Sequence, residues 1–215
     1  MNVISFCLYG NEPMYTIGLL KNTELAKEVY PDWNVWVYYA DVSNDIIDQC
    51  DATMINMKGS ELPGMFWRFL PDVERFIVRD TDSRLSMRER VAVDEWIASD
   101  KSLHIMRDHP HHKQTIMGGM WGIRAGDYNI EARVCDWCKR DKCWGHMHYS
   151  NADQRFLRQV VYPDFLGDTI AHESINSGFP NSVPFPTKME DYRFVGEIYD
   201  ENDNRSWQYK EWEKL

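Results

Sequence analysis

Blocks of apolar and polar residues predict strands and helices in turn along the first part of the chain. Residues 3–9 and 33–40 are apolar, β-branched or aromatic runs, typical of buried parallel strands. Between them, residues 15–30 carry apolar side chains at roughly helical spacing, and Pro31 ends that pattern. Strand, helix and strand in this order form a βαβ unit, so the chain begins as an α/β fold.

The rest of the chain continues this alternation less regularly. We expect helices at about 44–50, 86–99, 130–138 and 150–162, and strands at about 53–57, 76–78 and 103–107. Short strands and loops follow to the end. The sequence therefore predicts a single α/β domain over residues 1–215, with a mixed central sheet flanked by helices and an irregular C-terminal part. The charged, helix-like end at 207–215 would also suit a linker, as in a domain cut from a larger chain.

Two carboxylates stand just beyond the strand-forming run that ends at Val78. Side chains at i and i+2 of an extended segment point to the same side, so Asp80 and Asp82 can reach one point past the strand's C-terminal end. Open α/β sheets bind ligands at that edge. Close carboxylates repel unless a cation or a proton lies between them, which favours Mn²⁺ or Mg²⁺ completed by bound phosphates. The alternative is an Asx-type turn with solvated acids.

Composition limits the partners of such a site. The net charge of −10, with no basic stripe, argues against binding nucleic acid or an anionic membrane. No apolar run of about eighteen residues predicts a transmembrane helix. The N-terminus indicates a first strand rather than a signal peptide, and five cysteines fit a reducing, cytoplasmic setting. Aromatic residues make up 13% of the chain and suit stacking on sugars as well as core packing.

Phosphate-binding loops are absent from the sequence. No Gly-x-Gly-x-x-Gly follows the first strand, and no Gly-x-x-x-x-Gly-Lys-Ser/Thr occurs. Dinucleotide-dependent dehydrogenases and P-loop NTPases thereby lose their main support. A diphosphate held by a metal remains, and that is the expectation for a sugar-nucleotide transferase.

Five stretches resemble the GT-A glycosyltransferases, nucleotide-sugar enzymes that carry an Asp-x-Asp motif. In the family's order they are Ser5–Gly10, Phe66–Leu70, Arg79–Arg84, Gly118–Gly122 and Asp153–Leu157. The sequence also resembles the glycosyltransferase domain of a chlorella-virus protein involved in capsid glycan synthesis. The resemblance implies metal-dependent transfer of a hexose or deoxyhexose from a UDP-sugar to a glycan or glycoprotein acceptor. The place of action would be the cytoplasm, or the host cytoplasm for a viral protein.

The resemblance also implies site residues. Asp80 and Asp82, with Thr81 between them, would hold the metal on the donor diphosphate, and His172 would be a third ligand. The extended C-terminal ligand motif of the relatives is not visible here. Asp153 would be the catalytic carboxylate near the anomeric carbon, although it would also serve as a helix cap. The remaining donor contacts would be Tyr9 and Gly10 at uracil and ribose, Arg68 and Arg79 at ribose or phosphate, and Gly118, Gly119 and Trp121 beneath the sugar.

Purely structural roles are the alternative to these functional ones. Large aromatic residues usually pack in cores, and arginines pair with nearby acids. A second cluster of metal-ligating types could hold Zn²⁺, although buried free thiols explain it as well. Its members are Cys135, Cys138, Cys143, His146 and His148. Three further histidines, expected in a polar loop on the acceptor side, are His109, His111 and His112.

Three functional alternatives therefore remain open. One is a nucleotidyltransferase of the same fold, which usually needs a Gly-rich basic signature after the first strand. Another is a non-catalytic carbohydrate-binding domain, and the third is a zinc-stabilised interaction domain. In the favoured interpretation, residues from about 1 to 110 bind the nucleotide and metal, and residues from about 111 to 215 bind sugar and acceptor. The oligomeric state is left open.

Overall fold

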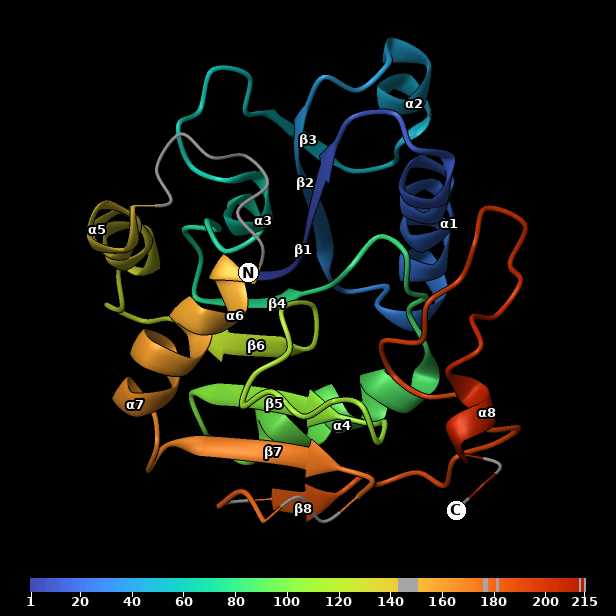
Figure 1. The fold of residues 1–215 in the computed structure, drawn as a ribbon, viewed down its shortest axis with the longest axis vertical. Coiled ribbons are helices and arrows are strands. Elements are labelled where there is room, and N and C mark those ends of the chain that lie inside the picture. The colour runs from blue at the N-terminus through green and yellow to red at the C-terminus, as the bar shows by residue number, and fades with distance from the viewer. Residues whose placement is uncertain (143–150, 176–177, 181, 213, 215) are drawn as a thin grey trace.

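The apolar runs of the first half build the parallel part of a central sheet (Figure 1). The structure, a computed structural model, describes residues 1–142, 151–175, 178–180, 182–212 and 214. β1 (Asn2–Tyr9) lies between β2 (Asn34–Ala40) and β4 (Arg75–Val78), and β3 (Thr53–Asn56) extends the sheet beyond β2, all in parallel. Helix α1 (Pro13–Val29) connects β1 to β2, which confirms the predicted βαβ unit.

The second half makes the sheet mixed. β6 (Trp121–Arg124) runs antiparallel between β4 and β5 (Leu103–Arg107), and β7 (Thr169–Glu173) and β8 (Ser182–Pro184) continue in parallel beyond β5. Within the described part of the chain the eight strands follow the order β3-β2-β1-β4-β6-β5-β7-β8. Because Val78 pairs with Trp121, the residues that leave β4 lie beside those that enter β6. This register positions the candidate site.

Helices cover both faces of the sheet, so alternate strand residues enter two cores. On one face, Ile4 and Phe6 of β1 pack with α1 and with α4 (Met87–Ala98). On the other, Val3 belongs to the core formed with α3 (Gly64–Trp67) and α5 (Ile130–Asp141). Burial on both faces explains why these strands are almost continuously apolar. The mixed α/β domain expected from the sequence is confirmed.

Short helices complete the chain. α2 (Asn44–Gln49) lies between β2 and β3, and α8 (Tyr209–Trp212) lies near the C-terminus. The expected helix after residue 150 is observed as α6 (Ala152–Phe156), a π-helical stretch (Leu157–Val161) and α7 (Tyr162–Asp164). It continues through Pro163, which occupies the first turn of α7, where a missing backbone N–H costs little. Among the described helices, none has the length and apolar character needed to cross a membrane.

Candidate functional site

Hydrogen bonds from α1 hold the turn that follows β4 in place. Asn22 of α1 donates its side-chain amide to the carbonyls of Thr81 and Ser83, at 3.3 and 2.8 Å, and accepts the Leu85 N–H at 3.0 Å. Within the turn, the Ser83 hydroxyl donates to the Asp80 carbonyl at 2.9 Å. These bonds fix the backbone on both sides of Asp82, so the carboxylates of the turn have defined positions.

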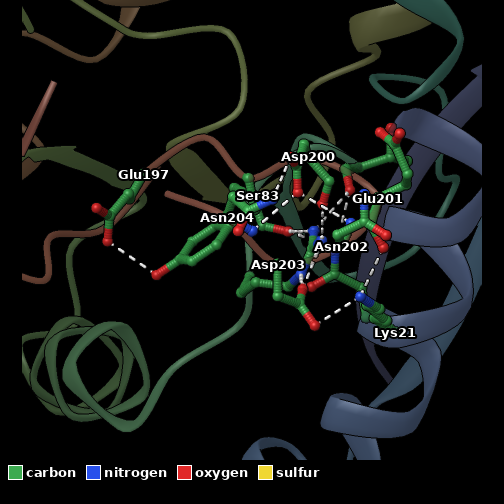
Figure 2. Close-up of polar contacts among 12 residues, drawn as sticks. Lys21, Ser83, Glu197, Asp200, Glu201, Asn202, Asp203 and Asn204 are labelled. Atoms are coloured by element: carbon green, nitrogen blue, oxygen red, sulfur yellow. Dashed lines mark hydrogen bonds and ion pairs between the residues drawn. The ribbon is translucent and has the colours of Figure 1, made fainter. Parts of the chain in front are cut away.

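The C-terminal segment holds the same turn from a second side. The Tyr199 N–H donates to the Asp82 carbonyl at 2.8 Å. Figure 2 shows the loop 200–204 lying beside Ser83 and Lys21, with Lys21 donating to the Glu201 carbonyl at 3.0 Å. Arg84 adds a bond to the Asp203 carboxylate at 3.0 Å. Residues more than a hundred positions apart in the sequence therefore support one turn.

Three charged side chains converge at the end of β4. One nitrogen of the Arg68 guanidinium contacts the Asp80 carboxylate, and another donates to Asp153 Oδ2 at 3.1 Å. Arg68 is 7% exposed and Asp153 is 6% exposed, whereas 43% of the Asp80 side chain is exposed. Burial raises the pKa of Asp153, and the positive charge of Arg68 opposes this shift. The predicted grouping of these residues is thus present in the geometry.

Two glycines lie directly against these carboxylates. A Cβ on Gly118 would come within 2.5 Å of Asp153 Oδ2, and a Cβ on Gly119 would overlap the Asp80 carboxylate. The segment before β6 can therefore approach the acids only because neither residue has a side chain. That these glycines lie beneath a donor sugar stays a prediction.

Asp82 is the unusual member of the site. Among the described residues its carboxylate has no ion-pair partner and no hydrogen bond from another residue; its own backbone N–H and the charges of Arg68 and Arg84 lower its pKa only in part. Burial and, second, the negative charge of Asp80 raise its pKa to about 7. A half-buried carboxylate without an ion-pair partner is costly, and a hard divalent cation relieves that cost. Asp80 and Asp82 therefore fit Mn²⁺ or Mg²⁺, but in the described part of the chain no third His, Cys, Asp or Glu joins them in a metal-binding group.

Three side chains predicted as donor or metal contacts lie in the interior instead. Arg79 is 1% exposed and donates to Glu89 of α4 at 2.9 Å. Trp121 is fully buried, with its ring 5.1 Å from that of Phe69. His172 is also fully buried in β7. Each side chain packs between the sheet and the helices that cover it, and therefore does not reach the open end of β4.

The surroundings of His172 account for its burial. Its Nδ1 lies 2.8 Å from Nε2 of His104 on β5, and its Nε2 lies 3.6 Å from the Glu95 carboxylate of α4. The parallel pairing of β7 with β5 brings the two rings together. His172 is therefore part of a buried histidine pair between the sheet and α4, and the structure does not place it with Asp80 and Asp82.

Tyr9 and Gly10 lie at the end of β1, next to the carboxylates. The half-buried Tyr9 ring packs edge-on against Trp67, with ring centroids 5.9 Å apart, and burial raises its pKa to about 12. Gly10 has φ +78°, a conformation that favours glycine, and its N–H donates to the Ala40 carbonyl. Contact of either residue with a nucleoside stays a prediction.

Two residues near the acids were not singled out by the sequence. Tyr15 at the start of α1 is 41% exposed, and burial together with the charges of Asp82 and Asp80 raises its pKa. Cys7 of β1 also lies close to the charged residues of the site. Burial raises the pKa of its thiol to about 11, and the positive charge of Arg68 opposes this rise. No motif in the sequence singles out either residue. Only their positions on either side of the loop at the end of β1 indicate that they lie near the site.

The secondary metal hypotheses have different outcomes. Cys135 is half-buried and Cys138 is buried, both on α5. Cys143, His146 and His148 lie outside the described residues, so the zinc site stays a prediction. The histidine loop after β5 is more enclosed than expected, with His109 3% exposed and His112 9% exposed.

Comparison with known structures identifies the fold as GT-A, the fold expected from the sequence. No family model matches the chain, and no curated protein does. An active-site mutant of LgtC superposes with TM-score 0.53 at 14% identity, over 100% of this chain and 94% of that chain. A glycosyltransferase involved in glycosylation of the major capsid of PBCV-1 gives 0.51 at 15%, over 80% and 81%. The mannosyltransferase PcManGT from Pyrobaculum calidifontis, in complex with GDP-Man and Mn²⁺, gives 0.51 at 9%, over 89% and 58%.

Proposed function

We propose that the protein is a metal-dependent glycosyltransferase that transfers a hexose or deoxyhexose from a UDP-sugar to a glycan or glycoprotein acceptor. The observation that carries the proposal is the unpaired, desolvated Asp82 beside Asp80 at the C-terminal end of β4. Arg68 and Asp153 complete an acid-rich site at the edge where open α/β sheets bind ligands. The similarity of fold to glycosyltransferases supports this assignment.

The metal would be held by Asp80 and Asp82. The PcManGT neighbour binds Mn²⁺ and GDP-Man, which supports a divalent metal and a nucleotide sugar for this chain. When bound, the metal would act as a Lewis acid that stabilises the charge of the diphosphate leaving group. Two protein carboxylates leave most of the coordination shell to donor phosphates and water, as is usual for Mg²⁺ in phosphate-binding sites.

The remaining side chains would handle the sugar. Arg68 keeps Asp153 oriented and neutralises part of its charge, so that this buried carboxylate is available beside the reacting centre. There Asp153 would orient hydroxyls, accept a proton or stabilise positive charge on the anomeric carbon. Gly118 and Gly119 let the segment before β6 lie directly against both acids, and this segment would form the floor under the sugar. The exposed part of the Tyr9 ring would contact the base.

A panel of UDP-sugars, assayed for Mn²⁺-dependent release of UDP, tests the proposal. Wild type should release UDP from at least one donor, and faster when the matching acceptor is added. Asp80→Ala should lose this activity, whereas Asp136→Asn on the exposed surface of α5 should keep it. Release of pyrophosphate from UTP and a sugar phosphate would instead identify a nucleotidyltransferase. Activity that persists in Asp80→Ala would exclude the proposed metal site.

A further inference from the structure

A large groove lies behind the carboxylate turn, on the face of the molecule formed by α1 and α4. Its volume is about 1020 Å³, at the upper end of the size of small-molecule sites. One wall is α1, another is the start of α4, and the third is the C-terminal segment between residues 187 and 205. It shares with the carboxylate site the side chains that support the turn from the C-terminal segment, such as Arg84 and Tyr199, but its lining includes none of the carboxylates Asp80, Asp82 and Asp153.

The lining of the groove combines an apolar floor with positive charge. Leu20 and Leu25 of α1 and Val91 of α4 supply apolar surface, and Met87 is 59% exposed beside them. Exposed apolar surface of this kind, gathered in a concave site, marks a binding surface more often than a lone exposed residue does. An apolar body is therefore the first requirement for an occupant.

Charge supplies the second requirement. Three acidic side chains line the groove, against six cationic ones. The cations are Lys21, Arg84, Arg88, Lys188, Arg193 and Arg205. This excess is the reverse of the net charge of −10 of the whole chain. A local positive field in an acidic protein selects anionic ligands.

The six cationic side chains differ in whether they are already paired with an acidic side chain. Arg88 donates to both oxygens of the buried Asp108 carboxylate, at 2.7 and 2.8 Å, and Arg84 is bonded to Asp203. Lys188 and Arg193 are exposed, and in the described part of the chain their side chains have no hydrogen-bond or ion-pair partner. Both lie on the C-terminal wall, where an anionic group could meet them while an apolar body covers the floor.

We propose that this groove is a second binding site, for a small amphipathic anion that carries an apolar chain and a phosphate-type group. Its ligand differs from a sugar nucleotide, which has no extended apolar body. The site is separate from the carboxylates of the β4 turn, so the proposal does not depend on the proposed function.

Titration calorimetry with octyl phosphate, a single-chain probe used as the free monomer, tests the site. Wild type should bind one molecule per chain. Inorganic phosphate and 1-octanol, each with half of the chemistry, should bind at least about tenfold more weakly. Equal binding of phosphate alone would overturn the amphipathic site and leave only an anion site. If 1-octanol bound as tightly as octyl phosphate, the positive charge of the groove would have no role in binding, and the proposal would be overturned.

Variants locate the binding. The double variant Lys188→Glu/Arg193→Glu changes two exposed side chains and should weaken octyl phosphate binding about tenfold or more. A matched control, Arg140→Glu/Arg158→Glu, makes the same charge change at exposed positions outside the groove and should bind as wild type. Asp82→Asn should also leave the affinity unchanged. Equal losses in both double variants, or loss in Asp82→Asn, would place the binding elsewhere and refute the proposal.

Discussion

Replacement of Asp82 by Asn removes the desolvated carboxylate while keeping its shape. Without metal, the folded protein raises the pKa of Asp82 from 3.8 to about 7, a shift that corresponds to about 4 kcal/mol if it is taken in full. Water reaches this half-buried side chain and Asp80 titrates alongside it, so about 1–3 kcal/mol is the expected effect. The metal-free Asn variant should therefore be more stable than wild type at pH 8.

The sign of this effect follows from linkage. An acid with a higher pKa in the folded state than in the unfolded state binds protons more tightly when folded. Its cost to stability is absent below about pH 4, grows between about pH 4 and pH 7, and is constant at higher pH. The difference in stability between Asp82→Asn and wild type should accordingly be near zero at pH 4 and largest at pH 8.

Denaturant unfolding in the presence of a chelator, at pH 4 and pH 8, measures this difference. Addition of Mn²⁺ at pH 8 should then stabilise wild type by mass action and leave Asp82→Asn nearly unchanged. Asp136→Asn, exposed on α5, serves as the control and should follow wild type in both experiments. A variant no more stable than wild type at pH 8, or still stabilised by Mn²⁺, would refute the reasoning.

Four further substitutions test the parts of the site separately. Gly119→Ala should displace the Asp80 carboxylate and weaken Mn²⁺ binding about tenfold or more by calorimetry. Unchanged affinity would show that the segment before β6 can move away from Asp80. Arg68→Gln leaves buried Asp153 without its ion pair and should cost about 3–5 kcal/mol in chemical unfolding, so a loss below about 1 kcal/mol would argue against the pairing. Asp153→Asn should keep nucleotide affinity in calorimetry and lower turnover at least about a hundredfold, whereas normal turnover would reduce its role to the ion pair with Arg68, since Asn151 and not Asp153 is the N-cap of α6. His172→Gln should lower thermal stability but leave the Mn²⁺ dissociation constant within about twofold; a large loss of affinity would restore it as a ligand.

Local patterns in the sequence were enough to predict the β4 turn. The apolar run into Asp80 and Asp82 identifies a strand end, and the spacing of the two acids places them on one side. The same alternation places Arg79 and Thr81 on the other side, and both are buried there, at 1% and 6% exposure. The expected ligand role of Arg79 did not take this parity into account.

Contacts between residues far apart in the sequence could not be predicted from local patterns. Asn22 reaches the carbonyl of Thr81 across 59 positions, and no spacing in the sequence links α1 to that turn. The burial of His172 depends on the register of β7 against β5, which becomes visible only when the strands are paired. Tyr199 reaches the turn from the C-terminal segment for the same reason.

Calorimetric titration of UDP into metal-free protein, with and without Mn²⁺, tests the central claim most directly. GDP and CMP serve as competing nucleotides, and Asp82→Asn serves as the site variant. The account predicts that UDP binds wild type only in the presence of Mn²⁺, and that Asp82→Asn does not bind it. UDP binding that is independent of Mn²⁺, or that survives in Asp82→Asn, would contradict the metal-held donor site. Absence of binding by any nucleotide would leave the GT-A fold without the proposed activity.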